Sequence, residues 1–345
     1  MNSLAVIVVN YRTPALALQA VGSLVPTRAS FRQFQVIVVD GGSDDGSAAA
    51  LAEGITAAGW SDWVTLLPLP VNGGFAFANN RAIAALATAG PLPQAVALVN
   101  PDARVRPGAL EAMAALLDRE PRAGAVGAQL IHQDGRRQSS AFRFPTLRGE
   151  FCRGARTHLF ERILGVPQSS VDSEVATEVP WVTGAAAMLR TEALAETGLF
   201  DEGFFLYFEE TELMRRLHRA GWTVWHEPAA RVVHEGGAAT QIRDPETGLP
   251  RARRTPSYWY QARRRYFALA HGRPAALAAG FAWLAGQLWW RLRQLVAPRP
   301  GHHPHRETRD LLAFGLWPAA RDGRAAVRPL DAAPGDRPAW MEPAR

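Results

Sequence analysis

The sequence predicts an α/β protein with a mostly parallel, twisted sheet that is flanked by helices and followed by a C-terminal helical appendage. Up to about residue 130, short aliphatic runs alternate with longer amphipathic stretches, the pattern of consecutive βαβ units. Several aliphatic runs end at an acidic or polar residue, and such strand ends converge on the ligand crevice of an open α/β sheet. With 345 residues and 48% hydrophobic content, the chain can bury a large core.

Five strands are expected in the first part of the chain, at residues 4–10, 35–40, 63–68, 95–99 and 124–130. Thr13 and Pro14 suit the N-cap and first turn of the helix that follows the first strand, and Pro107 opens a later helix. Right-handed crossovers would place the carboxyl ends of these strands along one edge of the sheet.

The regular pattern fades at 138–179, where Arg, Ser and Thr are frequent, and this predicts an irregular insertion or a mobile segment. Regularity returns with an apolar run at 181–189, a helix from Thr191, an aromatic run at 204–208 and a helix at 209–220. The polar, proline-containing segment 241–256 is the expected end of the main domain. We therefore expect a main domain at 1–240, a linker with amphipathic helices at 241–300 and an Arg-, Pro- and Ala-rich tail at 301–345.

Two helices are expected beyond this boundary, at 258–270 and 274–295. The apolar core of the second, 274–290, is shorter than the roughly 20 residues that span a bilayer. Its tryptophans and flanking arginines suit a helix that lies in a membrane interface. A helix packed on the main domain or on another subunit would show the same pattern, so both interpretations stay open. The tail is expected to be loose.

The charge and the cysteine content of the chain limit which binding partners and which cellular compartment are expected. The net charge of +6 comes entirely from arginine, because the chain has no lysine. Genome composition explains part of this bias, and arginine also suits binding of phosphate and anionic lipid. No known nucleic-acid-binding motif accompanies the charge, so nucleic acid is not an expected partner. Cys152 is the only cysteine, which excludes an internal disulfide and suits a reducing cytoplasm, and we see no signal peptide.

Polar residues follow the first two predicted strands. Asn10, Tyr11 and Arg12 close the first strand, and Asp40 closes the second before a loop of Gly, Ser and Asp. A carboxylate at a strand end can bind a nucleotide base or ribose, and glycines let the backbone approach a ligand. An ordinary strand-turn-helix with a capping residue would have the same appearance.

A second glycine-containing loop, 72–80, leads into a helix and contains Asn72, Gly74 and Asn80. Exposed amides at a helix start favour a phosphate, although a plain turn is the alternative. The chain lacks both the Walker A pattern and the GxGxxG fingerprint. Triphosphate and dinucleotide sites of the usual kinds, including that of a dehydrogenase, are therefore not expected.

Asp102 and His234 are candidate ligands for a divalent cation. Asp102 follows the buried strand 95–99, and His234 follows a later aliphatic run. Carboxylate oxygens suit a hard cation, and the oxygens of a diphosphate can complete a shell that the protein leaves open. A neutral imidazole can serve as a second ligand. A turn aspartate and a structural histidine are the alternatives.

The aromatic run 204–208 leads directly into Glu209 and Glu210. Aromatic side chains exclude water, and carboxylates in the first turn of a helix are stabilised in their ionised form by its dipole. A base that takes a proton from a sugar hydroxyl would suit this position. A core aromatic run followed by an ordinary acidic first turn is the alternative.

The ordered set of motifs resembles glycosyltransferase family 2, whose members have the GT-A fold, and particularly its rhamnosyltransferase-like members. The resemblance covers residues 4–237, and the matching motifs are Val9-Asn10-Tyr11, Val38-Val39-Asp40, Asn72-Gly73-Gly74, Asn100-Pro101-Asp102, Thr183-Gly184-Ala185, Phe200-Asp201-Glu202, Phe204 to Glu210 and His234-Glu235-Gly236.

This resemblance implies an inverting transfer of a sugar from a nucleoside diphosphate donor, with rhamnose from dTDP-rhamnose favoured, to a hydroxyl of a lipid-linked or cell-envelope glycan. Glu210 would deprotonate the acceptor, and Asp102 and His234 would hold Mg²⁺ or Mn²⁺. The expected setting is the cytoplasmic face of the inner membrane, and a homo-oligomer is left open. The implied nucleotide-sugar-binding residues are Asn10, Tyr11, Arg12, Asp40, Asn72, Gly74, Asn80 and Asp102, and the implied pocket residues are Trp181, Gly184 and Glu209.

Two positions depart from the family pattern. Gly41 stands where the family usually has Asn, and Glu210 and Glu212 stand where it usually has Asp. The added methylene of Glu moves the carboxylate of the base by about one bond length. A misplacement of roughly 1 Å can lower the rate about a hundredfold. A nucleotide-sugar-binding or scaffold protein of the same fold, with weak or no turnover, is therefore the alternative function.

Overall fold

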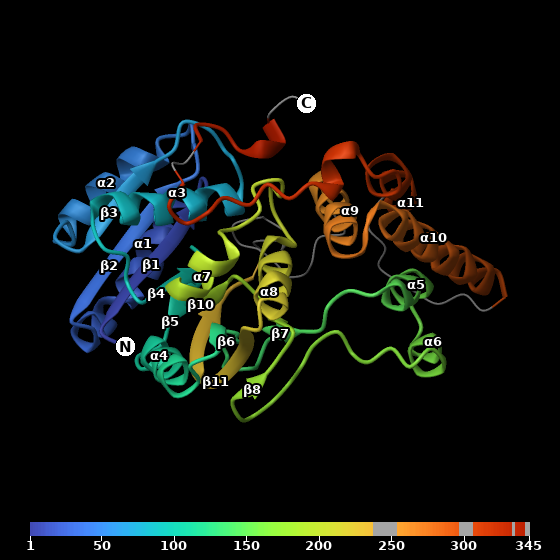
Figure 1. The fold of residues 1–345 in the computed structure, drawn as a ribbon, viewed down its shortest axis with the longest axis horizontal. Coiled ribbons are helices and arrows are strands. Elements are labelled where there is room, and N and C mark those ends of the chain that lie inside the picture. Colours follow the sequence, from blue (N-terminus) through green and yellow to red (C-terminus); the bar gives the residue numbers. More distant parts are fainter. Residues whose placement is uncertain (237–253, 297–305, 333–334, 342–345) are drawn as a thin grey trace.

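The computed structural model describes residues 1–236, 254–296, 306–332 and 335–341. Its centre is a curled sheet in the order β3-β2-β1-β4-β10-β6-β11-β5, with β8 paired to β11 (Figure 1). The first four strands are parallel, β6 and β11 are parallel, and β10 runs antiparallel between β4 and β6. The strands are β1 Ser3–Asn10, β2 Gln33–Asp40, β3 Val64–Pro68, β4 Ala95–Val99, β5 Ala103–Val105, β6 Ala123–Ile131, β8 Thr177–Glu178, β10 Ala186–Arg190 and β11 Thr223–His234.

Helices cover both faces of this sheet, as the sequence predicted. The alternating side chains of the strands face two cores: Val6 and Val8 contribute to one, Ala5 and Ile7 to the other. The first core is closed by α1 Pro14–Ser23, α2 Ser47–Ala57 and α4 Ala109–Arg119, and the second by α3 Phe75–Ala89, α7 Thr191–Thr197 and α8 Glu209–Arg219. The five strands predicted before residue 131 are confirmed to within two residues at each end.

The prediction of an irregular insertion at 138–179 was wrong for two segments, which form α5 Leu147–Ala155 and α6 His158–Ile163. Each begins at a threonine whose side chain accepts a backbone hydrogen bond, Thr146 from Gly149 and Thr157 from Leu159. Their apolar residues were not recognised because the helices are short and pack on the appendage instead of the sheet. A small separate sheet, β7 Ala141–Phe142 with β9 Trp181–Val182, closes the base of the insertion.

The two appendage helices are confirmed as α9 Ser257–His271 and α10 Arg273–Val296. Helix α10 packs on α5 through two glycines: a Cβ on Gly154 would lie 2.2 Å from the Trp283 carbonyl oxygen, and one on Gly286 would lie 2.1 Å from that of Phe151. Insertion and appendage therefore form one helical unit beside the sheet (Figure 1). Most of the expected boundary at 241–256 lies outside the described residues. None of the described helices combines the length and the apolar character needed to cross a bilayer.

The expectation of a loose tail was wrong for residues 306–332 and 335–341: the first part packs on the appendage helices, and the rest runs back to the main domain (Figure 1). The N–H of Leu199 donates to the Arg328 carbonyl at 2.9 Å, and Arg328 Nε donates to Glu202 Oε2 at 3.0 Å. Trp340 Nε1 donates to the Gly73 carbonyl at 2.9 Å. Composition suggested disorder, but these contacts give the segment a fixed path. Its short elements are α11 Glu307–Asp310, η2 Leu311–Gly315, η3 Ala320–Gly323 and η4 Ala339–Met341; η1 Val25–Ser30 follows α1.

The close packing of α10 on α5 predicts that substitutions at two neighbouring positions of α10 lower the stability of the protein by different amounts. Gly286→Val would force a side chain into the backbone of α5, so we expect the free energy of unfolding to fall by about 1–3 kcal/mol or more. Ala285→Val, one position away on the exposed side of α10, should have a much smaller effect. Chemical denaturation of both variants measures the difference, and equal losses would contradict this packing.

Candidate active site

The carboxylate of Asp40 is fixed at the edge of the sheet. Asn10 Nδ2 donates to Asp40 Oδ1 at 2.8 Å, and the N–H of Ser43 donates to Asp40 Oδ2 at 3.0 Å. Asn10 and Asp40 are the paired last residues of β1 and β2, and both are buried. Tyr11 and Arg12 follow at the surface, where the Arg12 guanidinium lies 5.1 Å from the Tyr11 ring.

The loop after Asp40 lies against the second glycine loop. A Cβ on Gly42 would lie 2.5 Å from the backbone of Val71, and in the next residues Asn72 Oδ1 accepts from the N–H of Gly74 at 3.1 Å. Gly74 has a φ of +86°, and a Cβ there would lie 1.9 Å from the carbonyl oxygen of Phe205. A glycine is therefore required for the aromatic run 204–208 to reach this loop.

Gly184 lies near the start of α3, the base and the loop of the candidate metal ligand. Its backbone N–H acts to lower the pKa of Glu210, and a Cβ on Gly184 would lie 3.9 Å from the Cβ of Glu210 and 3.3 Å from the ring of Phe75. The carbonyl of the next residue, Ala185, accepts from the N–H of Asn100 at 2.9 Å, two residues before Asp102. Segments that are far apart in the sequence, the start of α3, the start of α8 and the loop of Asp102, are therefore close together in space around Gly184.

Asp102 and His234 are brought together, with 3.3 Å between Asp102 Oδ1 and His234 Nε2. Antiparallel pairing of β5 with β11 sets this contact, because Ala103 lies opposite His234. Asp102 Oδ1 is buried and has no hydrogen-bond partner among the described residues. An unpartnered carboxylate oxygen beside an imidazole nitrogen fits a divalent cation.

The protein would supply only part of the coordination shell of such a cation. The described residues contain no group of three or more His, Cys, Asp or Glu side chains that could hold a metal. Asp102 and His234 therefore suit an ion whose other ligands are diphosphate oxygens and water, as the sequence suggested.

The two carboxylates at the start of α8 have different environments. Burial raises the pKa of Glu210, and the interactions with its own N–H and that of Gly184 oppose this effect. Burial, followed by the negative charge of Glu210, raises the pKa of Glu209 well above its usual range. Glu210 faces a cavity and is the member of the pair whose ionised form the Gly184 N–H favours, so it is the one placed to act as a base.

Glu210 faces a cavity of about 580 Å³ between the small sheet, α5 and α9. Trp181 also lines it, stacked on Phe142 with a ring separation of 4.6 Å, and Trp181 Nε1 donates to the Arg143 carbonyl at 3.0 Å. Other lining groups include Phe144, Arg153, Tyr207, Phe208 and Trp259. Glu150 and Glu161 line the cavity as well, and this mixture of aromatic faces with charged groups of both signs suits a polar ligand such as a glycan.

Of the three predicted pocket residues only Trp181 lines this cavity, and two predicted site residues are buried away from it. Glu209 is buried outside the cavity lining. Asn80 is also buried, where Nδ2 donates to the Phe200 carbonyl at 2.9 Å and Oδ1 accepts from the Phe200 N–H at 3.1 Å. The expected contact of Asn80 with the donor is therefore not supported, because its amide already fastens α3 to the loop before the aromatic run.

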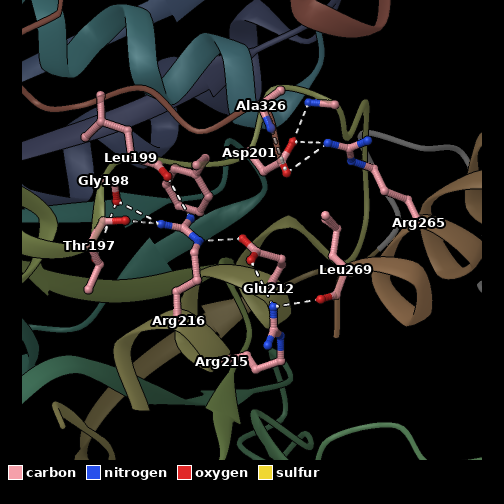
Figure 2. A network of polar contacts seen from close by, with 12 residues as sticks. Thr197, Gly198, Leu199, Asp201, Glu212, Arg215, Arg216, Arg265, Leu269 and Ala326 are labelled. Atoms are coloured by element: carbon pink, nitrogen blue, oxygen red, sulfur yellow. Dashed lines mark hydrogen bonds and ion pairs between the residues drawn. The ribbon is translucent and has the colours of Figure 1, made fainter. Parts of the chain in front are cut away.

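Two of the three departures from the family pattern, at Gly41 and Glu212, have local explanations. Gly41 donates its N–H to the Asn10 carbonyl at 2.8 Å, and a Cβ at this position would lie 3.1 Å from the same oxygen. Glu212 points away from the site: Arg216 Nε donates to it at 2.8 Å, and Arg215 approaches it at 3.6 Å (Figure 2). Glu212 thus fixes α8 instead of contributing a second base.

Sequence reasoning missed Gln138, and it missed the backbone conformation of Tyr207 and Phe208. Gln138 Nε2 donates to the His234 carbonyl at 2.6 Å, but Gln138 lies where the chain has no periodic pattern. Tyr207 and Phe208 both have positive φ, +74° and +69°, immediately before α8. Consecutive strained non-glycine residues are typical of functional sites, and they aim the following carboxylates, yet aromatic residues give no sequence signal for this conformation.

Comparison with known proteins decides the family. Residues 5–198, more than half of the chain, match the model for glycosyl transferase family 2. The chain belongs to this family. It is also 32% identical over 237 residues, 64% of this chain and 72% of the relative, to an N-acetylglucosaminyl-diphospho-decaprenol L-rhamnosyltransferase of Mycobacterium tuberculosis strain CDC 1551 / Oshkosh.

Solved structures agree with the fold of this glycosyltransferase. A mannosyltransferase, PcManGT from Pyrobaculum calidifontis in complex with GDP-Man and Mn²⁺, has a TM-score of 0.52 at 18% identity, covering 90% of this chain and 79% of the other. GalNAc-T7 with UDP, GalNAc and Mn²⁺ has a TM-score of 0.53 at 15% identity, covering 85% and 54%. The predicted GT-A fold is confirmed.

The raised pKa of Glu210 predicts the position of the acid limb of the glycosyltransferase pH profile. A base must be deprotonated, so activity should fall as the pH decreases through a value above the range of an exposed glutamate. The measurement is kcat/KM as a function of pH. Glu192→Gln is the control, because Glu192 is an exposed acidic residue in the first turn of α7 and its loss should leave the acid limb unchanged. A limb at the position of an exposed carboxylate would contradict the assignment.

Gly74→Ala is predicted to lower kcat/KM by about 10- to 100-fold, because the aromatic loop must move away from the glycine loop. Gly272→Ala is the matched control. Gly272 has nearly the same backbone conformation, with φ +87° and ψ 162° against +86° and −179°, but the atom nearest to a Cβ there, Pro274 Cδ, would lie 3.7 Å away. Equal kinetic losses in both variants would attribute the effect to backbone strain alone.

Proposed function

We propose that this family 2 glycosyltransferase moves a sugar, with L-rhamnose from dTDP-rhamnose favoured, to a hydroxyl of a lipid-linked or cell-envelope glycan with inversion at the anomeric carbon. The observation that carries the proposal is the position of Glu210, in a large cavity and linked through Gly184 to the loop that bears Asp102. The name of the mycobacterial relative supports both the sugar and the lipid-linked acceptor.

The donor would bind along the carboxyl edge of the sheet. Asp40 is held by Asn10 where a nucleotide base or ribose can reach it, and Tyr11 with Arg12 would cover it from the surface. The backbone around Gly74 would approach the diphosphate at the start of α3. A divalent cation, Mg²⁺ or Mn²⁺, held by Asp102 and His234 would supply stabilisation of the negative charge on the leaving diphosphate. Both solved relatives with similar folds are named with Mn²⁺.

The chemical step is a single displacement. Glu210 takes the proton of the acceptor hydroxyl, whose oxygen forms a bond to the anomeric carbon while the bond from that carbon to the diphosphate breaks. The electron pair of the broken bond leaves with the nucleoside diphosphate. The aromatic wall of Tyr207, Phe208 and Trp181 would orient the acceptor and exclude water, so that hydrolysis of the donor does not compete.

A lipid-linked acceptor would place the enzyme in the cytoplasm at the inner face of the membrane, bound peripherally. The aromatic and arginine residues of the cavity, among them Trp259 and Arg153, would contact the sugar and anionic parts of that acceptor.

The test is transfer by the purified chain with a panel of thymidine and uridine diphosphate sugars, a lipid-linked N-acetylglucosamine acceptor and Mg²⁺ or Mn²⁺. Glu210→Gln is expected to lower kcat by about 100- to 10,000-fold because the base is lost, with little change in donor affinity. Asp102→Asn should weaken donor binding measured in the presence of the cation.

Glu192→Gln serves as the control for the loss of a carboxylate. Full turnover by both site variants would exclude the proposed mechanism. Tight donor binding without transfer or donor hydrolysis, across all acceptors, would favour a nucleotide-sugar-binding protein of the same fold.

A further inference from the structure

Helix α10 has two apolar faces. One consists mainly of small residues and is buried against α5, α9 and the tail: Ala276, Ala279, Gly280, Trp283 and Gly286. The residues on the opposite side, which are spaced three, four or seven positions apart, are exposed and large: Phe281, Leu288, Leu292 and Leu295. An ordinary surface helix is polar on its outer side, so the outer face of α10 is unusual.

The exposed face of α10 is long and continues onto α6. From Phe281 to Leu295 it extends for about 20 Å. Exposed fractions are 50% for Phe281, 59% for Leu288, 52% for Leu292 and 82% for Leu295. The ring of Trp289 lies 5.2 Å from that of Phe160 on α6, where Leu159 is 56% exposed. We call the face formed by Phe281, Leu288, Trp289, Leu292, Leu295, Leu159 and Ile163 the α10 face.

Exposed hydrophobic side chains are concentrated here. Of the 15 large hydrophobic residues that are exposed in the described part of the chain, six belong to α10 and two to α6, so the α10 face is a patch and not a random scatter. Figure 1 shows α10 and α6 at one end of the molecule, away from the sheet.

Positive charge surrounds the α10 face. Arg291 and Arg293 lie on α10 at its two sides, and Arg148 and Arg162 are exposed on α5 and α6. Helix α10 has no acidic residue, and the acidic residues nearby are paired: Glu161 with His158 and Glu150 with Arg263. An apolar strip with an arginine rim is complementary to a bilayer surface that contains anionic lipid, where the strip enters the interface and the arginines meet the headgroups.

We propose that the α10 face is the surface by which the protein docks on an anionic membrane, with α10 lying in the plane of the interface. The sequence left two interpretations of this helix open, contact with a membrane and packing on protein. In this proposal the outer face contacts the membrane, and the inner face packs on protein. Helix α5 is packed between α10 and the cavity that contains Glu210, so docking would bring the cavity close to a lipid-linked acceptor. That last consequence rests on the proposed function, whereas docking itself does not.

The test is co-sedimentation of the full chain with vesicles of equal parts phosphatidylcholine and phosphatidylglycerol, and with vesicles of phosphatidylcholine alone, without donor or acceptor. The protein should bind the anionic vesicles more strongly, and the double substitution Leu288→Asp and Leu292→Asp should reduce binding by about tenfold or more. Val25→Asp with Val175→Asp is the matched control, because it removes two exposed aliphatic residues elsewhere and changes the net charge equally.

Three results would overturn the proposal. The unsubstituted chain could fail to bind anionic vesicles, the two double variants could lose binding equally, or the α10 variant could convert a dimer to a monomer with unchanged vesicle binding. The last result, seen by analytical ultracentrifugation, would identify the face as a contact between copies. Since the assay contains no sugar, a failure here is distinct from a failure of the proposed transfer.

Discussion

The active-site architecture depends on buried arginine-carboxylate contacts that hold the segment before α8 from both sides (Figure 2). Arg216 donates to Glu212 on its own helix and to the carbonyls of Thr197 and Leu199, at 2.6 and 2.7 Å. From the appendage, Arg265 donates to Asp201 at 2.7 Å. A buried charge that loses its partner destabilises the fold. These contacts therefore hold the loop before α8 in a single conformation. Two strained residues at the start of α8 can be tolerated because the chain on both sides of them is fixed.

Strand pairing supplies the second constraint. Parallel β1 and β2 end together at Asn10 and Asp40, whereas antiparallel β5 and β11 bring Asp102 to His234. Gly184, just before the antiparallel β10, joins the two halves. The site is thus formed where the direction of the strands changes, as expected for ligand crevices in open α/β sheets.

Much of this arrangement could be predicted from the sequence, because strand ends such as Asp40 and Asp102 follow buried aliphatic runs whose period is strong. The pairing of Asp102 with His234 followed from motif order. The helices α5 and α6 could not be recognised, since their apolar residues contact α10, far away in sequence, instead of the sheet. The fixed path of the tail was also hidden: Arg264 and Arg328 look like surplus surface charge, but they pair with Asp322 and Glu202. The composition shows how many charged residues the chain has, but it does not show which of them form pairs.

The pairing of Asp201 with Arg265 also bears on the order in which the protein matures. During synthesis, the aromatic loop and α8 leave the ribosome before α9 does, so Asp201 emerges without its guanidinium partner. Trp340, which reaches back to Gly73, is released later still. The nascent chain can complete the sheet before these partners emerge, whereas the contacts that hold the loop before α8 can form only after α9 and Trp340 have been made. The sheet and the loop before α8 therefore depend on segments that are synthesised at different times.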